Sequence, residues 1–308
     1  MKLMAPDYYP EFGCIAGACR HSCCIGWEID IDDETLAKYR SVSGAFGKRL
    51  NDGIAMNDGQ ASFRLCEDER CPFLNGDGLC DIILNLGVDA LSQICTDHPR
   101  YRNFFSDREE IGLGLCCEAA GRLILGRKEK TEWIVLEDDG ERDEKDPFED
   151  EILAVREELV SIAQKRELSV DERMEHMLKY AGLSLPETSV GAWAEFYLGL
   201  ERLDPAWGEL LESVRDAKIT ALDFDETALE QLLVYFLFRH IAGAMDEADL
   251  SARAAFAVHA VQMIRSLTTL KYGRYSLDAL VETARMYSSE IEYSDENMQA
   301  ILEAFENA

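Results

Sequence analysis

The segment FGCIAGACRHSCCIGW, residues 12–27, carries four cysteines within eleven positions: Cys14, Cys19, Cys23 and Cys24. A packed core does not need thiols at this density, whereas zinc and iron–sulfur clusters are bound by thiolates in such groups. Cys19 and Cys23 are four positions apart and would share one face of a helical turn. The segment therefore predicts an irregular fold held together by a metal centre.

The remaining cysteines also lie in the first part of the chain, so that all ten occur within the first 117 of 308 residues: Cys66, Cys71, Cys80, Cys95, Cys116 and Cys117. The sequence Asn75-Gly76-Asp77-Gly78 predicts a tight turn that brings Cys71 and Cys80 toward each other. A helix expected over residues 114–125 would carry Cys116 and Cys117 in its first turn, where the helix dipole lowers a thiol pKa.

The cysteine spacing does not decide between zinc and an iron–sulfur cluster. It lacks the paired knuckles of zinc fingers and the short Cys spacings of ferredoxins. A Cys-x3-Cys-x2-Cys motif that begins at Cys19 would need a third cysteine at position 26, which is Gly26. Both metal chemistries stay open at this point.

Composition indicates a folded cytoplasmic protein. The chain is 47% hydrophobic and 30% charged, and its N-terminus has no apolar run of the secretory type. The most apolar stretch, residues 229–245, is interrupted by charged and polar side chains, so we interpret it as a buried core helix rather than a membrane span. In a reducing cytosol, clustered cysteines more often bind metal than form disulfides.

The net charge is −29, of which −6 falls in residues 1–130 and −23 in residues 131–308. This balance argues against nucleic acid as a partner, because phosphate binding needs a basic surface. It would suit a lysine-rich substrate, or it only keeps the protein soluble.

We predict a mainly α fold with three parts: an irregular cysteine-rich, metal-binding domain over 1–136 with a few short strands, an acidic linker over 137–151, and a helical domain, with a helical bundle as the default, over 152–308. The linker holds ten acidic residues and only two basic ones. In the first part we expect strands at 28–32 and 61–65 and helices at 34–50 and 81–94, the second broken at Gly87 and capped anew by Asp89. Apolar residues at helical spacing predict eight helices in the second part: 150–167, 170–181, 191–203, 206–217, 225–245, 249–270, 276–290 and 295–305.

Several segments, taken together and in order, resemble one family. They are residues 6–32 (PDYYPEFGCIAGACRHSCCIGWEIDID), 71–100 (CPFLNGDGLCDIILNLGVDALSQICTDHPR) and 116–125 (CCEAAGRLIL). Downstream, residues 234–250 (VYFLFRHIAGAMDEADL) and 287–302 (YSSEIEYSDENMQAIL) continue the resemblance. The family is that of the flagellin lysine-N-methylases (FliB), which belongs with the YkgJ-like CxxCxxCC cysteine-cluster proteins.

The resemblance implies an enzyme that transfers methyl groups from S-adenosylmethionine to lysine Nε groups of flagellin and depends on a cysteine-ligated [4Fe-4S] cluster. The matching cysteine positions are Cys14, Cys19, Cys23, Cys24, Cys71, Cys80, Cys95 and Cys116. Two positions depart from the family pattern: Cys117 stands where proline is expected, and Cys66 is an addition. Eight thiolates exceed the four ligands of one cubane, so a second metal or unligated thiols are part of this prediction.

The residues themselves give no G-x-G-x-x-G cradle for a methyl donor. We therefore expect any S-adenosylmethionine to bind near the cluster or between the two main parts of the chain. Methyl transfer needs a neutral lysine amine, so an acidic, histidine or tyrosine side chain must orient it or accept its proton. The candidates near the cysteine motifs are Tyr8, Tyr9, Asp97, His98, Tyr101 and Glu118.

Two other functions fit the same residues. The first is a non-enzymatic metal-binding or redox-sensing protein, in which a cysteine-ligated zinc or iron–sulfur centre switches a helical partner-binding domain. The second is a zinc-stabilised adaptor. Iron content and saturable binding of S-adenosylmethionine distinguish the three.

Overall fold

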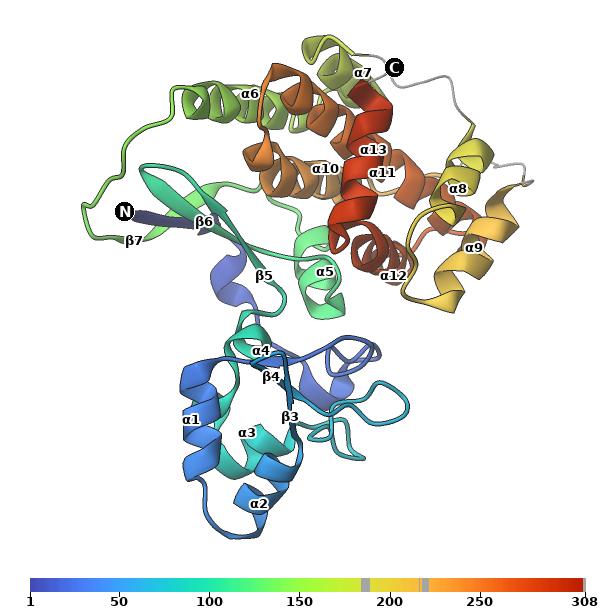
Figure 1. Cartoon of the computed structure of the whole chain (residues 1–308). Helices are drawn as coiled ribbons and strands as arrows, with labels where there is room; N and C mark the ends of the chain where they lie inside the picture. Colours follow the sequence, from blue (N-terminus) through green and yellow to red (C-terminus); the bar gives the residue numbers. More distant parts are fainter. Residues whose placement is uncertain (184–188, 216, 218–221, 307–308) are drawn as a thin grey trace. The chain divides into compact units, whose positions relative to one another are not determined.

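The computed structural model describes residues 1–183, 189–215, 217 and 222–306. The chain forms two compact units. One, here called the cysteine unit, comprises Gly13–Arg100, and the other, here called the helical unit, combines Met1–Phe12 with Tyr101–Ala308. The chain is mainly helical with some strands, as the sequence predicted (Figure 1).

The cysteine unit contains four short α-helices and an antiparallel sheet of order β2-β4-β3. Their bounds are β2 Asp30–Ile31, α1 Asp33–Ser41, α2 Gly44–Asp52, β3 Ile54–Asn57, β4 Gln60–Phe63, α3 Asp81–Leu86 and α4 Gln93–Asp97, with single 3-10 turns at Ala16–Ala18 and Val88–Ala90. Aromatic rings fill its core, where the ring centroids of Phe63 and Phe73 lie 4.9 Å apart and the Tyr39 ring stacks on that of Phe63.

Local sequence signals predict most of the helix starts and ends in this unit. Asp32 caps α1 by accepting a hydrogen bond from the Thr35 amide, and Gly87 ends α3 with a φ of 92°, which favours glycine. Two details were wrong. The helix expected over 34–50 is two helices, and the last one begins after Ser92, while Asp89 lies in the preceding 3-10 turn.

The helical unit opens with a four-stranded sheet of order β5-β6-β1-β7. Its strands are β1 Lys2–Pro6, β5 Arg100–Phe104, β6 Arg108–Leu113 and β7 Trp133–Asp138. The N-terminal strand β1 is central, since it pairs parallel with β6 and antiparallel with β7. None of these strands is predicted from the sequence. For β1 the reason is that its partners β6 and β7 lie more than a hundred residues away, and such pairing leaves no local pattern.

The helices of this unit agree with the prediction for the second part of the chain. They are α5 Glu118–Leu125, α6 Phe148–Ala163, α7 Val170–Tyr180, α8 Val190–Leu198, α9 Pro205–Arg215, α10 Glu226–His240, α11 Glu247–Tyr272, α12 Leu277–Tyr287 and α13 Asp295–Glu306, with 3-10 turns at Tyr9–Glu11 and Ile241–Gly243 and a π-helical segment, η5, at Ser288–Glu292. Asp216, near the end of the helix expected over 206–217, lies outside the described residues.

Helices α10 and α11 form the centre of this unit: α10 packs against α5, α6 and α11, and α11 packs against α12 and α13 (Figure 1). Nearly every residue of α10 is buried, which confirms that the apolar stretch is a core helix. Among the described residues, no helix is both long and apolar enough to cross a bilayer.

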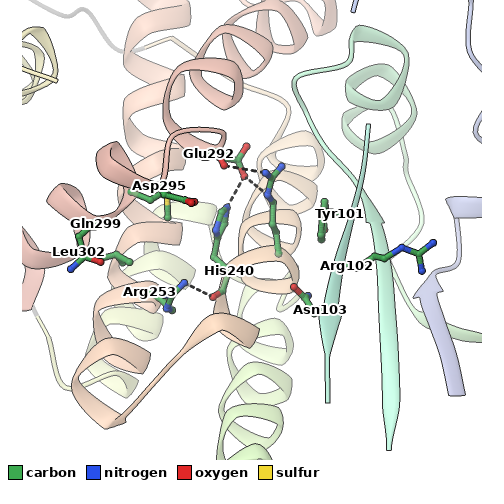
Figure 2. Close-up of a pocket in the computed structure, with 11 residues that line it drawn as sticks. Tyr101, Arg102, Asn103, His240, Arg253, Glu292, Asp295, Gln299 and Leu302 are labelled. Carbon is green, nitrogen blue, oxygen red and sulfur yellow. Dashed lines mark hydrogen bonds and ion pairs between the residues drawn. The ribbon is translucent and has the colours of Figure 1, made fainter. Parts of the chain in front are cut away.

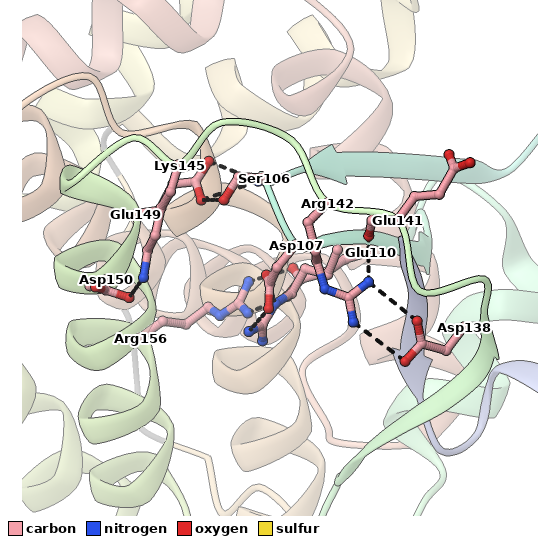
Figure 3. Close-up of polar contacts among 11 residues, drawn as sticks. Ser106, Asp107, Glu110, Asp138, Glu141, Arg142, Lys145, Glu149, Asp150 and Arg156 are labelled. Atoms are coloured by element: carbon pink, nitrogen blue, oxygen red, sulfur yellow. Dashed lines mark hydrogen bonds and ion pairs between the residues drawn. The ribbon is translucent and has the colours of Figure 1, made fainter.

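The predicted acidic linker is exposed but is tied to the sheet of the helical unit (Figure 3). Glu149, in the first turn of α6, accepts hydrogen bonds from the Ser106 amide and hydroxyl at 2.9 and 2.5 Å. The amide of Asp143 donates to the Ser106 carbonyl, and Arg142 pairs with Asp138 at the end of β7. The segment thus joins two elements of one compact unit, and the division into units falls elsewhere, at Gly13 and Tyr101.

A buried ion pair connects the sheet to the first long helix. Arg156 of α6 donates to both carboxylate oxygens of Glu110 of β6, at 2.6 and 2.5 Å (Figure 3). Its guanidinium lies over the rings of Phe105 and Phe238. The two side chains are 6% and 2% exposed. A charge so deeply buried is stable only with its partner.

Candidate functional site

Four thiols gather around the core of the cysteine unit. Cys71 is buried in the core, and Cys24, Cys80 and Cys95 pack against it half-buried. They come from four different stretches of the chain, yet Cys24 and Cys80 both lie close enough to Cys95 to raise its thiol pKa, and all three raise that of Cys71. The structure thus brings together four of the eight cysteines named as metal ligands.

Backbone pairing sets the positions of the first two. The amide of Cys71 donates to the Cys24 carbonyl at 2.8 Å, and Ile25 forms an antiparallel bridge with Arg70. The motif around Cys14–Cys24 is therefore joined directly to the segment that contains Cys71. Arg70 supports the turn that follows by donating to the Leu74 carbonyl.

The predicted tight turn places Cys80. The side-chain oxygen of Asn75 accepts hydrogen bonds from the amides of Asp77 and Leu79, each at 3.0 Å, and Leu74 and Cys80 form an antiparallel bridge. This turn was expected from the Asn-Gly-Asp-Gly sequence, and the structure confirms it. Cys95 lies on α4, which is held by the second carboxylate oxygen of Asp32 through the Gln93 amide at 2.9 Å.

Burial shapes the electrostatics of the four thiols. It raises the pKa of Cys71 to about 12 and that of Cys95 to about 11, and it also raises the pKa of Cys80. A hydrogen bond with the Cys23 side chain lowers the pKa of Cys24 to about 7. A bound cation would favour the thiolate at all four positions, because metal binding displaces thiol protons.

The donor set fits a thiolate-bound metal in type and number, since four soft ligands are what a structural zinc or a cubane cluster takes. The described side chains do not already converge as a finished site: among them, no three His, Cys, Asp or Glu side chains are arranged to hold a metal ion. The four thiols are therefore a candidate metal site, and metal binding would have to bring their sulfur atoms closer together.

The other cysteines have different surroundings. Cys14 and Cys23 are exposed on the 12–27 segment together with the partly exposed Cys19, whose thiol donates to the His21 carbonyl at 3.2 Å, and Cys66 is also exposed. Cys116 belongs to the helical unit, where its thiol meets the hydroxyl of Tyr293.

The prediction for the helix that follows Cys116 was wrong in two respects. Helix α5 begins at Glu118, so Cys116 precedes it and Cys117 is its N-cap residue. Burial raises the pKa of Cys116 to about 12 and outweighs any effect of the helix dipole.

The residues predicted to handle the lysine proton fall in both units. In the cysteine unit, Asp97 accepts a hydrogen bond from Gln93 at 2.8 Å. His98 lies 5.9 Å from Trp27 between ring centroids, and burial, with a contribution from Arg100, lowers its pKa to about 4. Both side chains stay predicted candidates.

The other four candidates belong to the helical unit. Tyr8 is fully buried in its core, and Tyr9 packs against the same core. Burial raises the pKa of Tyr8 and of Tyr101. Glu118 is buried and lies 3.7 Å from Arg122. These surroundings suit structural roles for Tyr8 and Glu118, whereas Tyr101 lines a pocket.

This pocket, of about 380 Å³, lies entirely within the helical unit (Figure 2). Its walls come from β5, from the end of α10, from α11, from the last residue of the π-helical turn η5 and from α13. Tyr101, Asn103, Arg239, His240, Arg253 and Glu292 are among the side chains that line it.

A buried polar network centred on Glu292 supports the pocket. The carboxylate contacts His240 Nε2 at 2.6 Å (Figure 2). It also contacts the Tyr235 hydroxyl at 3.0 Å, and Arg239 Nε lies 3.3 Å away. The Arg239 guanidinium is held between the rings of Tyr101 and Tyr293, at 4.8 and 4.6 Å from their centroids.

The network has defined protonation states. Burial acts to raise the pKa of Glu292, but Arg239 and His240 outweigh it and hold that pKa at about 2. Burial lowers the pKa of His240 in spite of the carboxylate. We therefore assign an ionised Glu292 that accepts a hydrogen bond from the Nε2–H of a neutral His240.

Sequence reasoning missed this network. It interpreted His240 as structural and named neither Arg239 nor Glu292. A usable signal was present, because Glu230, Gln231, Arg239 and His240 interrupt the most apolar stretch of the chain, and buried charged groups are rare unless they are paired.

Comparison with known proteins supports the family resemblance. Residues 191–308 match the FliB lysine N-methylase C-terminal domain. A stretch of 126 residues, 39% of this chain, is 32% identical to a lysine-N-methylase of Salmonella choleraesuis and covers 31% of that protein. A lysine-N-methylase of Salmonella typhimurium is 30% identical over the same length and is covered to 31%.

The flagellar biosynthetic protein FliU of Salmonella muenchen is also 30% identical over 126 residues, and here 75% of the relative is covered. The matched part of the chain thus spans about a third of the lysine-N-methylases but three quarters of FliU. No solved structure matches the chain. Because the match covers 75% of FliU at 30% identity, and because residues 191–308 of this chain match the FliB C-terminal domain, this chain belongs to the FliB lysine-N-methylase family.

Proposed function

We propose that the chain is a protein lysine N-methyltransferase that moves a methyl group from S-adenosylmethionine to lysine Nε and depends on a cysteine-ligated [4Fe-4S] cluster. The observation that carries the proposal is the match of residues 191–308 to the FliB lysine N-methylase C-terminal domain. The pocket and its buried charge network lie in the unit that contains this matched region.

For the cluster, we propose Cys24, Cys71, Cys80 and Cys95 as ligands. Their support is their common place around one core, their soft donor atoms and a number equal to that of the irons in a cubane. A cluster bound there would supply an electron-transfer centre. Cys14, Cys19 and Cys23, which lie on the same 12–27 segment as Cys24, would be the ligands of a second metal.

The proposed substrate is flagellin or a similar protein with exposed lysines, and the flagellar name of the relative FliU supports this choice. The net charge of −29 would attract a lysine-rich surface, and the acidic 137–151 segment is exposed for such an encounter. A cytoplasmic enzyme would meet flagellin before its export.

The test is methyl transfer from S-adenosylmethionine labelled in its methyl group to purified flagellin, with protein prepared without oxygen. Cys95→Ser should lose iron and most methyl transfer. Cys66→Ser is the matched control, because Cys66 is exposed and is not one of the four proposed ligands. Circular dichroism must show both variants folded.

Label on lysine side chains that disappears when the lysines of flagellin are acetylated supports the proposal. Wild-type protein with a full complement of iron that transfers no methyl group would overturn it. Protein that contains zinc alone, with Cys95→Ser as active as wild type, would remove the cluster from the proposal and leave the transferase.

A further inference from the structure

The pocket of the helical unit is built around an irregularity in the backbone. The π-helical turn Ser288–Glu292 interrupts the passage from α12 to α13 and places Glu292 against His240 and Arg239 (Figure 2). Such turns are rare, cost stability and occur often at functional sites. A second costly feature lies at the same place, namely the buried ion pair between the Glu292 carboxylate and the Arg239 guanidinium.

The net charge around the pocket follows from its charged lining residues and their ion-pair partners. Three arginines line it, and each has a carboxylate: Arg102 pairs with Glu109, Arg239 with Glu292 and Arg253 with Asp249. His240 is neutral. Among the described residues, Asp295 is the lining carboxylate without an ion pair, so the local net charge is −1.

A ligand that complements this lining carries a net charge of +1 and both signs. The unpaired Asp295 at the exposed start of α13 suits a cation, while Arg253 has a second terminal nitrogen beyond those bonded to Asp249 and to the His240 carbonyl. The side-chain oxygen of Asn103, whose amide nitrogen donates to the Phe238 carbonyl, adds a hydrogen-bond acceptor.

We propose that this pocket is the methyl-donor site and binds S-adenosylmethionine, which carries one carboxylate, one ammonium and one sulfonium. The inference rests on the proposed function and goes beyond it by assigning the donor to the helical unit. Asp295 faces the positive charges of the ligand, and Arg253 faces its carboxylate. A simple anion would find no excess positive charge here, and a lysine side chain has no carboxylate for Arg253.

The test measures binding by isothermal titration calorimetry on the metal-loaded protein, with no methyl acceptor present. The ligands are S-adenosylmethionine, S-adenosylhomocysteine, which lacks the sulfonium charge, and decarboxylated S-adenosylmethionine. Asp295→Asn is compared with Glu296→Gln, its neighbour in the same first turn of α13, which is exposed and does not line the pocket.

Asp295→Asn should weaken S-adenosylmethionine roughly fivefold, as one exposed charge contact does, and S-adenosylhomocysteine much less. Glu296→Gln should change neither. Arg253→Gln should abolish the preference of the wild type for S-adenosylmethionine over its decarboxylated form. This difference between ligands tests the contact even if the substitution lowers stability.

Equal affinity of wild type, Asp295→Asn and Arg253→Gln for all three ligands would overturn the site while leaving the transferase intact. A lysine peptide that loses affinity in Asp295→Asn, with S-adenosylmethionine unaffected, would likewise overturn it. Wild-type protein that binds no S-adenosylmethionine but contains its metal would overturn the proposed function together with the site.

Discussion

Replacing Glu292 by glutamine removes the carboxylate that neutralises the buried Arg239 and accepts a hydrogen bond from His240. The side chain keeps its shape, so the change tests charge rather than packing. Arg239 would keep its hydrogen bonds to the Tyr235 hydroxyl and the Glu292 main chain but would lose its counter-charge.

The size of the effect follows from the pKa of Glu292, which is held at about 2 against an ordinary value of 4.5. Since a tenfold change in proton affinity equals about 1.4 kcal/mol, the ionised carboxylate stabilises the folded state by roughly 3 kcal/mol. That agrees with the ~3–5 kcal/mol lost when one partner of a buried ion pair is removed.

The sign of the pH dependence is fixed, because the pKa of Glu292 is lower in the folded state than in the unfolded chain. The stabilisation is fully present above the ordinary glutamate pKa and is lost as the pH falls toward 2. The difference between wild type and Glu292→Gln should therefore be greatest near neutral pH and fall to about half by pH 3.

Urea unfolding followed by tryptophan fluorescence at several pH values measures this difference. Glu157→Gln, an exposed position of α6, is the control and should stay within about 0.5 kcal/mol of wild type. A Glu292→Gln protein within 1 kcal/mol of wild type at neutral pH, or a difference that does not shrink in acid, would refute the assigned charge state.

Three further predictions concern stability and can be read from the same unfolding curves. Glu110→Gln should cost about 3 kcal/mol or more by leaving Arg156 buried without a partner, and replacing both by apolar residues should recover most of it; an unaffected single variant would contradict the buried pair. Gly112→Ala should cost about 1–3 kcal/mol, because the new methyl group overlaps the Tyr101 ring, and wild-type stability would show that the ring moves freely. Asp32→Ala should lower stability by about 1–2 kcal/mol, because it removes the side-chain hydrogen bonds to the first turns of α1 and α4. It should also lower the iron content, and a destabilised variant with normal iron content would show that the position of α4 does not matter for metal binding.

The elements with strong local signals could be predicted from sequence. The long amphipathic helices from α6 to α13 and the turn at Asn75 follow from apolar periodicity and from turn chemistry. Cys24, Cys71, Cys80 and Cys95 belong to the larger set of eight cysteines named as ligands from the family resemblance, but nothing in their spacing singles out these four.

What the sequence did not reveal depends on contacts between distant segments. The parallel pairing of β1 with β6 draws the first residues into the helical unit, and no local pattern encodes it. The pocket brings together side chains near positions 101, 239 and 292. These positions lie in a strand, at a helix end and in a π-helical turn, and none of them by itself indicates a pocket. Cys116 was named a ligand from the family resemblance, and the contact of its thiol with the Tyr293 hydroxyl has no local signal in the sequence.

The central claim is tested most directly by the mass of lysine-containing flagellin peptides after incubation with S-adenosylmethionine and the anaerobically prepared protein, before and after its iron is removed by a chelator. We expect lysine peptides heavier by whole methyl groups with the iron-loaded protein and unmodified peptides after chelation, with activity restored when iron and sulfide are added back. Unmodified peptides with the iron-loaded protein, or equal methylation with and without iron, would contradict it.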